Sequence, residues 1–214
     1  MVPKLFYFPG NANLAPHMVL EELGAPYELV LVDRAKNAHK SAEYMKLNPM
    51  GRIPTYVDGD LVISETAAIC LHLADKYPAK GLAPALGSPE RGRFYSWLMY
   101  LTNTVQAELI FHFYPEKIAD ADSARAEIKA KEEASVGGMF DTIEETLAGH
   151  GGPYLLGQTY SILDPYLLML GRWTRNMKRP ARTLPKVSAF MTRMLERPAV
   201  KRAFEQEGLK APLI

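Results

Sequence analysis

The apolar and polar positions of the first 77 residues alternate between compact runs and runs with helical spacing. Compact apolar runs such as Lys4 to Phe8 predict strands, and apolar residues on one side predict amphipathic helices. Asp58-Gly59 between two apolar runs is a strong signal for a β-hairpin. The predicted order is β-α-β-α-β-β-α, with strands at 4–8, 27–32, 53–57 and 61–63 and helices at 14–23, 41–47 and 64–77. A hairpin that follows βαβ implies a small mixed sheet with an antiparallel edge.

The composition changes after residue 77. Residues 78–88, PAKGLAPALGS, contain two prolines and two glycines, which is typical of a linker. Ser88-Pro89-Glu90 predicts a helix start with Ser88 as the N-cap. Long helices are predicted beyond it, at 89–113, 122–148, 161–175 and 184–206, and Ser161 with Asp164 forms a variant capping box ahead of a core helix. We expect an α/β domain at 1–80, a linker at 81–88 and an all-α domain at 89–214.

Charge and composition narrow the class of function. Lys and Arg number 25 against 24 Asp and Glu, so no overall field favours nucleic acid or a membrane surface as a partner. No apolar stretch approaches the ~20 residues that span a bilayer. The single cysteine, Cys70, excludes an internal disulfide and favours a cytoplasmic location, and its mid-helix position indicates a small buried hydrophobe. The five histidines fall at no metal-ligand spacing, so we expect no metal.

The segment NPMGRIPTYV, residues 48–57, puts a proline directly before a strand. If the Ile53–Pro54 bond is cis, the N–H and C=O of Ile53 turn outward and can pair with an extended peptide as with another strand. The alternative is that Pro54 only begins a strand in the trans form.

The segment ISETAAI, residues 63–69, predicts a helix capped by Ser64 with Glu65 and Thr66 in the first turn. Free N–H groups, the helix dipole and the Thr66 hydroxyl suit a carboxylate, and Glu65 suits an ammonium. A site for a carboxylate beside a site for an ammonium matches the headgroup of an amino acid, which carries both charges on one carbon. The alternative is that these are ordinary first-turn residues.

The loop FPGNAN, before the first helix, contains no thiol, hydroxyl or carboxylate at Asn11-Ala12-Asn13. Asn11 or Asn13 can donate an amide N–H at the helix start, where a thiolate brought by a ligand is favoured. Tyr7 at the end of the strand offers a hydroxyl. The alternatives are N-capping for Asn13 and core packing for Tyr7.

The order of these segments resembles the cytosolic glutathione transferases over essentially the whole chain. The resemblance is most specific in LNPMGRIPTYVDGDLVISETAAICLHLADKYP, residues 47–78, and closest to bacterial members of the beta-like and theta-like classes. It implies a thioredoxin-like N-terminal domain that binds glutathione, an all-helical C-terminal domain, a homodimer, and detoxification of small hydrophobic electrophiles.

The resemblance also implies roles for individual residues. Ile53, before a cis-Pro54, would pair its backbone with the cysteinyl unit of glutathione, and Glu65 and Thr66 would hold the γ-glutamyl end. Basic residues would lie near the glycine carboxylate: Lys36, His39, Lys40 and Arg52. The second-substrate pocket would be formed by Met99, Asn103, Gln106 and Phe113.

The opening loop departs from the family pattern. Beta-class relatives carry a cysteine two residues after the glycine and a serine next, where this chain has Ala12 and Asn13. A mixed disulfide with the protein at that position is therefore excluded, and the serine of theta-like relatives is also missing. Bacterial members resembling a nu class use asparagine as the thiolate donor and reduce glutathione-linked disulfides. Asn13 is expected to take that part, with Asn11 and then Tyr7 as alternatives.

The leading prediction is a glutathione transferase whose bound thiolate attacks an electrophile. One alternative keeps glutathione but reduces disulfides or peroxides. The other is a non-catalytic binding module with the same fold.

Overall fold

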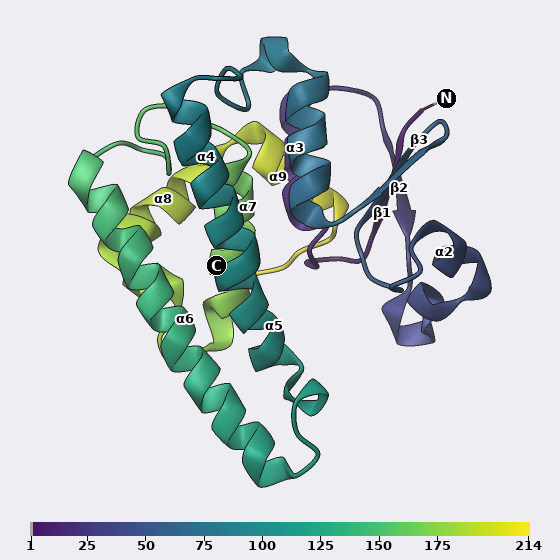
Figure 1. Cartoon of the computed structure of the whole chain (residues 1–214), viewed down its shortest axis with the longest axis vertical. Coiled ribbons are helices and arrows are strands. Elements are labelled where there is room, and N and C mark those ends of the chain that lie inside the picture. Colours follow the sequence, from purple (N-terminus) through teal and green to yellow (C-terminus); the bar gives the residue numbers. More distant parts are fainter. Residues whose placement is uncertain (1) are drawn as a thin grey trace. The chain divides into compact units, whose positions relative to one another are not determined.

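The computed structural model describes residues 2–214, and the chain divides into two compact units. The first contains the chain up to Ala83 together with Glu196–Lys210, and the second contains Pro84–Leu195 and Ala211–Ile214. Figure 1 shows strands and helices in the first unit and helices in the second. No helix within residues 2–214 has both the length and the apolar character needed to cross a membrane.

The first unit is built on a four-stranded mixed sheet with the order β2-β1-β3-β4. β1 pairs in parallel with β2 and antiparallel with β3, and β3 and β4 form an antiparallel hairpin closed at Gly59 (φ 62°). Leu5 and Tyr56 pair across the sheet and are buried. The bounds are β1 Lys4–Tyr7, β2 Glu28–Leu31, β3 Thr55–Asp58 and β4 Leu61–Ser64. The predicted mixed sheet with its antiparallel edge is confirmed.

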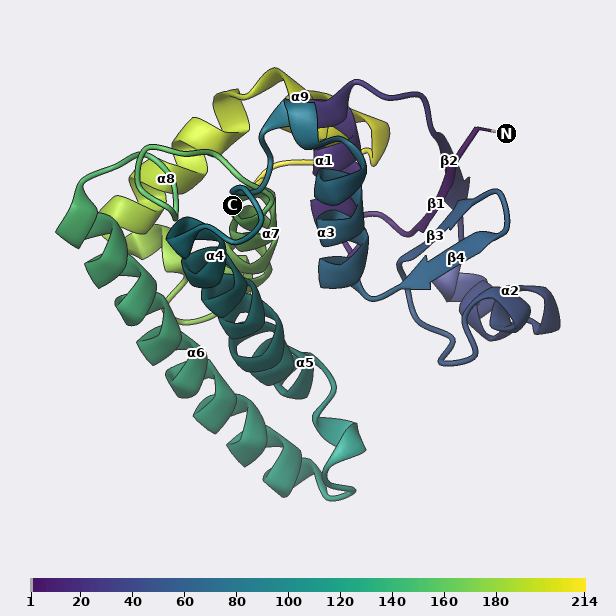
Figure 2. The same ribbon diagram turned by 45° about the horizontal axis from the view of Figure 1, so that its top comes forward.

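Helix α1 lies at the centre of the helical layer of this unit. It contacts both α3 and α9, and Figure 2 shows these helices close together. Because neighbours cover it on several sides, nearly all of its side chains are buried. The helices are α1 Leu14–Leu23, α2 Ala42–Leu47, α3 Thr66–Lys76 and α9 Pro198–Gln206, with 3₁₀ turns at Arg34–Lys36, Ala38–Lys40 and Pro78–Lys80.

Helix α9 belongs to the first compact unit, although it follows the helices of the second unit along the chain. The sequence pattern predicts one helix over 184–206 within the all-α domain, but α8 (Pro185–Glu196) ends first and Pro198 begins a separate helix. The apolar side of α9 is buried, and its polar side chains pair with α1: the Arg197 guanidinium bonds both carboxylate oxygens of Glu22 at 2.6 and 2.9 Å. These contacts group α9 with the α/β unit.

The second unit is all-helical, as predicted. Its first long run consists of α4 Pro89–Met99, a π-helical segment Tyr100–Gln106 and α5 Ala107–Phe113. A short 3₁₀ turn, Pro115–Lys117, leads to α6 Asp122–His150, which is followed by α7 Leu163–Trp173 and α8. Helix α7 is almost entirely buried. The predicted capping box is present, because Asp164 Oδ2 accepts the Ser161 N–H at 2.8 Å and the Ser161 hydroxyl accepts the Leu163 N–H at 3.3 Å.

Candidate active site

The turn before β3 has the geometry that its sequence allowed. The Ile53–Pro54 peptide bond is cis, so the trans alternative for this proline is wrong. The carbonyl of Arg52 accepts two hydrogen bonds, from the Tyr44 hydroxyl at 2.6 Å and from Asn48 Nδ2 at 2.8 Å. Tyr44 in α2 and Asn48 at its C-cap thus hold the turn in place through the Arg52 carbonyl.

The backbone of Ile53 is unpaired. Within the described chain, neither its N–H nor its carbonyl has a hydrogen-bond partner, and the residue is half-buried. An N–H and a C=O side by side at a sheet end are the groups with which an extended peptide pairs. The turn therefore offers a strand-like ligand one open backbone position.

Close packing at Gly51 brings two of the predicted basic residues, His39 and Lys40, next to the turn. Gly51 has φ 57°, and a Cβ there would lie 2.8 Å from both the His39 carbonyl oxygen and Lys40 Nζ, so only glycine fits. Burial, followed by the charges of Arg34 and Lys40, lowers the pKa of His39. Lys40 and His39 are thus neighbours of the turn that carries Arg52.

Lys36, the fourth basic candidate, is engaged elsewhere. Its ammonium lies 3.4 Å from Asp33 and its side chain is largely exposed.

The start of α3 differs from the prediction in one respect. Ser64 is the last residue of β4, paired with Thr55, so the expected Ser64 cap is wrong and Glu65 holds the N-cap position. Glu65 has φ 71° and ψ 119°, a conformation that costs a non-glycine residue about 1–3 kcal/mol. Strain of this kind is concentrated at ligand sites. The first turn of α3 still leaves its N–H groups without partners inside the helix.

Thr66 ties α3 to the opening loop. Its hydroxyl donates to the Ala12 carbonyl at 3.1 Å, so the hydroxyl proton is already used and is not the free donor that was expected. The same bond puts the start of α3 next to the loop between β1 and α1.

Asn13 is buried at the base of that loop. Its side chain has no exposed area: Oδ1 accepts the Phe8 N–H at 3.1 Å and Nδ2 donates to Glu207 Oε1 at 2.8 Å. It also forms no side-chain cap for α1. Asn13 therefore holds the loop in place, and this burial corrects the expectation that it faces a ligand thiolate.

Glu207, just beyond α9, is the residue that holds Asn13. Its carboxylate is buried and accepts the Gly10 N–H at 2.7 Å as well as the bond from Asn13. Its role cannot be predicted from the sequence, because a single glutamate in EQEGL has no local feature that distinguishes it from its neighbours.

Asn11 and Tyr7 remain accessible. Both are half-buried, and the Tyr7 hydroxyl has no partner within residues 2–214. Asn11 Oδ1 accepts a hydrogen bond from Arg34 Nη1 at 2.9 Å, whereas its Nδ2 has no partner in the same part of the chain. Arg34 is a second residue that the sequence analysis missed.

The four residues expected to form a second-substrate pocket lie in the second unit. Met99 and Asn103 share an exposed side, with Asn103 Nδ2 3.9 Å from Met99 Sδ. Gln106 instead receives a hydrogen bond from the buried hydroxyl of Tyr166 in α7. Phe113 packs edge-on against Trp173, with ring centroids 6.2 Å apart. The structure thus brings Met99 and Asn103 together and directs Gln106 and Phe113 toward residues of α7.

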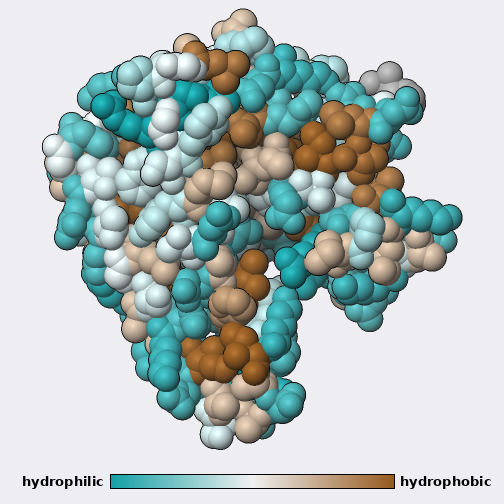
Figure 3. All heavy atoms as spheres, viewed as in Figure 1, coloured by the Kyte–Doolittle hydropathy of each residue, from teal (hydrophilic) through white to brown (hydrophobic). Residues whose placement is uncertain are grey.

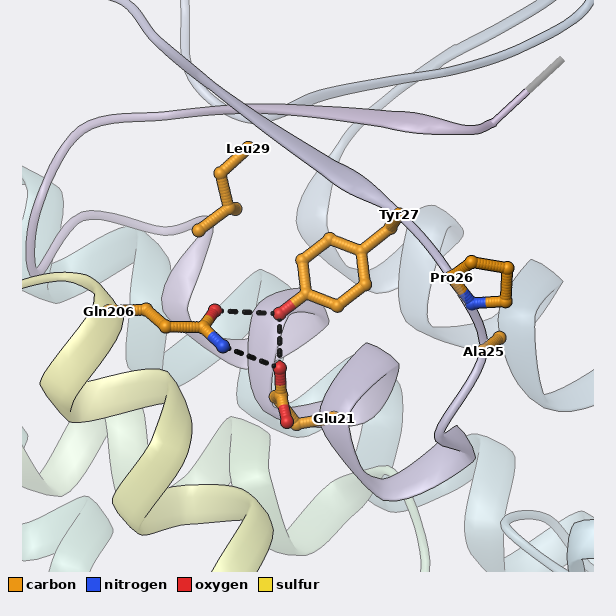
Figure 4. A pocket seen from close by; sticks show the side chains of 6 residues that line it. All are labelled: Glu21, Ala25, Pro26, Tyr27, Leu29 and Gln206. Atoms are coloured by element: carbon orange, nitrogen blue, oxygen red, sulfur yellow. Dashed lines mark hydrogen bonds between the residues drawn. The ribbon is translucent and has the colours of Figure 1, made fainter.

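A shallow hollow on the first unit contains none of the predicted residues. Figure 4 shows it lined by Glu21, Tyr27 and Gln206 with Ala25, Pro26 and Leu29. Its polar side chains bond to one another: the Tyr27 hydroxyl donates to Glu21 Oε1 at 2.5 Å and Gln206 Nε2 donates to the same oxygen at 2.9 Å. Because these polar atoms satisfy each other, the hollow offers little to a ligand.

No group of three or more His, Cys, Asp or Glu side chains within the described residues is arranged to hold a metal ion.

A thioredoxin-like unit with an open cis-proline turn, followed by an all-helical unit, defines the class of two-domain glutathione transferases.

Comparison with known proteins agrees with this class. The family model for the glutathione S-transferase N-terminal domain matches residues 1–75, and that for the C-terminal domain matches residues 107–207. The chain is 32% identical to glutathione S-transferase GstA of Escherichia coli O157:H7, over 97% of this chain and 100% of that one. The chain belongs to the glutathione S-transferase family, and the predicted enzyme class, a glutathione transferase, is confirmed.

Two solved structures are similar along their whole length. One is a glutathione transferase homologue from Sulfitobacter with bound glutathione, with a TM-score of 0.87 and 27% identity, covering 98% of this chain and 99% of that one. The other is a sphingomonad glutathione S-transferase complexed with glutathione, with a TM-score of 0.83 and 34% identity, covering 97% and 100%.

Proposed function

We propose that the chain binds reduced glutathione along the open turn of its first unit and activates the thiol for attack on a small hydrophobic electrophile. The unpaired backbone of Ile53 beside cis-Pro54 carries this proposal, because it matches the backbone of the cysteinyl unit. The bound glutathione in the Sulfitobacter and sphingomonad relatives supports the choice of ligand.

The two ends of the tripeptide find complementary charges in this proposal. Glu65 receives the γ-glutamyl ammonium, and the N–H groups at the start of α3, beginning with Thr66, receive its carboxylate. The positive charges of Arg52 and Lys40, with His39 beside them, attract the glycine carboxylate. Lys36 contributes least, because it is paired with Asp33.

The thiolate is stabilised by Asn11, whose Nδ2 has no other partner among the residues that the structure describes, with the Tyr7 hydroxyl as the second candidate. Glutathione brings its own thiol, so the protein needs donors and not a base. Lowering a thiol pKa from ~8.5 to ~6.5 takes about 2.7 kcal/mol of preference for the charged form. A helix start and one or two hydrogen bonds supply that amount.

The protein's own thiol takes no part. Ala12 stands at the beta-class cysteine position, and Cys70 is fully buried in α3, where burial raises the pKa of its thiol. Disulfide or peroxide reduction, the alternative reaction, would therefore have to use glutathione thiols alone. Turnover of a mixed glutathione disulfide, compared with conjugation of a chloronitrobenzene, separates the two reactions.

We further propose that the electrophile is held by Met99, Asn103, Gln106 and Phe113 of the helical unit. Phe113→Ala is expected to raise the KM for the chloronitrobenzene and to leave the Kd for glutathione unchanged. An unchanged KM would remove Phe113 from this role.

The proposed partner is a second copy of the chain. Leu61 and Val62 on the edge strand β4 are each 42% exposed, and Figure 3 shows hydrophobic surface over this part of the sheet. An apolar edge of this kind is normally covered in the functional state. Light scattering that gives the mass of one chain at micromolar concentration would contradict a homodimer.

Calorimetric titration with reduced glutathione tests the main proposal. We expect saturable binding, weakened about tenfold or more in Glu65→Ala, because a charged hydrogen bond is worth roughly 1.5–3 kcal/mol. Lys46→Ala, an exposed basic residue of α2, is the control and should bind like the parent chain. Absence of heat and saturation at millimolar glutathione would overturn the proposal.

A further inference from the structure

The hydrogen bond between Asn11 and Arg34 joins the opening loop to the first 3₁₀ turn after β2. From this bond we infer that Arg34 is a positioning residue for thiol activation: it orients the Asn11 amide toward the sulfur and adds a positive charge beside the thiolate. The inference rests on the proposed binding of glutathione and extends it to a residue outside the set predicted from the sequence.

The chemistry of the two side chains fixes the amide orientation. A guanidinium only donates hydrogen bonds, so the atom that Asn11 presents to Arg34 must be its acceptor, Oδ1. The distance from Nη1 to Oδ1 is 2.9 Å. The amide is planar, so Nδ2 then points to the other side and keeps both hydrogens for a ligand. Within residues 2–214 it has no partner.

The backbone around Asn11 is already fixed. The Asn11 N–H donates to the Phe8 carbonyl at 3.1 Å, and the Asn11 carbonyl accepts the Leu14 N–H at 3.0 Å. The next residue, Ala12, is tied to Thr66. Side-chain rotation is therefore the main freedom left to Asn11, and the bond to Arg34 removes it. Without that bond, half of the amide orientations would turn a carbonyl oxygen toward the sulfur and repel the thiolate.

Arg34 is itself held in place. Asp33 caps its turn by accepting the N–H groups of Ala35 at 3.0 Å and Lys36 at 3.4 Å. The charge of Arg34 also contributes to the lowered pKa of His39, after the larger effect of burial. A cation held beside Asn11, where the glutathione thiol is proposed to lie, favours the thiolate form.

The test measures the pKa of the bound glutathione thiol from its ultraviolet thiolate absorbance. Arg34→Lys keeps the charge but loses the planar donor group, and Arg34→Met loses both. We expect the thiol pKa to rise by about one unit in Arg34→Met and by a smaller amount in Arg34→Lys. Binding of glutathione should change by less than about threefold, because neither variant touches the backbone of Ile53 or the start of α3.

A double variant separates positioning from a general charge effect. In the Asn11→Ala background, Arg34→Lys should cause no further rise in the thiol pKa, because no amide remains to be oriented. Lys46→Met removes a positive charge from the same unit and should leave the pKa unchanged.

The outcomes distinguish this inference from the proposed function. If glutathione binds and Arg34→Lys and Arg34→Met leave the thiol pKa unchanged, the positioning role is overturned while glutathione binding stands. An additional rise from Arg34→Lys in the Asn11→Ala chain would also overturn it. If the parent chain binds no glutathione, the proposed function itself fails. Circular dichroism checks that each variant is folded, and Arg34→Lys keeps the test valid should Arg34→Met not fold.

Discussion

His17 Nδ1 lies 2.8 Å from Glu207 Oε1, and both side chains are completely shielded from solvent although 190 positions separate them in the chain. The pair joins α1 to the end of α9. The other ring nitrogen, Nε2, faces the hydroxyl of Tyr27 at 2.9 Å and Gln206 Oε1 at 2.8 Å. A buried polar network of this kind specifies one arrangement of two helices, and the same carboxylate holds the opening loop of the site.

Removing Glu207 should therefore cost stability and disturb the loop. In Glu207→Ala, the Gly10 N–H, the Asn13 amide and His17 lose their shared acceptor. We expect the free energy of unfolding to fall by about 3 kcal/mol or more, because each buried polar group left without its partner costs roughly 1–3 kcal/mol. Urea unfolding measures the change.

The neighbouring Glu205 supplies a matched control. It is exposed, and Glu205→Ala should change the free energy of unfolding by less than about 0.5 kcal/mol. Equal losses in the two variants would show that Glu207 does not hold the loop.

Asn13 and Asn11 should respond in opposite ways. Asn13→Ala leaves the Phe8 N–H without its acceptor and removes one of the hydrogen bonds to Glu207, which should lower the free energy of unfolding by about 1–3 kcal/mol. The pKa of the bound glutathione thiol should stay unchanged if the variant is folded. Asn11→Ala should raise that pKa with little loss of stability. A raised thiol pKa in Asn13→Ala would restore Asn13 as the donor and contradict the buried geometry.

Features decided by neighbours in sequence could be predicted. The Asp58-Gly59 hairpin and the capping box at Ser161 each depend on a few adjacent residues, whereas the cis bond at Pro54 was left open by the residues and implied only by the family resemblance. The two-domain architecture followed from the order of such segments. The predicted ends of helices and strands were less accurate where a residue can either pair in a strand or cap a helix. Ser64 is such a residue: it pairs in strand β4 and does not cap α3.

Features decided by distant residues could not be predicted. Asn13 looked like a cap or a thiolate donor, and only its bond to Glu207, 194 positions away, shows that it is a core residue. Arg34 belongs to the candidate site because it bonds to Asn11, and no local sequence pattern indicates that contact. The place of α9 in the first unit likewise depends on its packing against α1, which is distant in the sequence.

Glu65 should show a conflict between stability and binding. Its φ of 71° suits glycine, so Glu65→Gly should relieve strain and leave the free energy of unfolding unchanged or raised by about 1 kcal/mol. The same change removes the carboxylate proposed for the γ-glutamyl ammonium, so glutathione should bind about tenfold or more weakly. Urea unfolding and calorimetry measure the two effects. Glu65→Ala keeps the strain and loses the carboxylate, so it should lose binding without gaining stability.

Glu21 should contribute to acid sensitivity. Burial by itself would raise the pKa of Glu21, but hydrogen bonds from Tyr27, Arg202 and Gln206 outweigh it and lower the pKa below the usual value. A lowered pKa in the folded state means that the contribution is complete above the unfolded pKa and is lost as the pH falls through the folded one. We therefore expect the free energy of unfolding to decrease below about pH 4.5, and to decrease less steeply in Glu21→Gln. Urea unfolding between pH 6 and pH 3 measures the slopes, and identical slopes would show that these hydrogen bonds do not favour the ionised carboxylate.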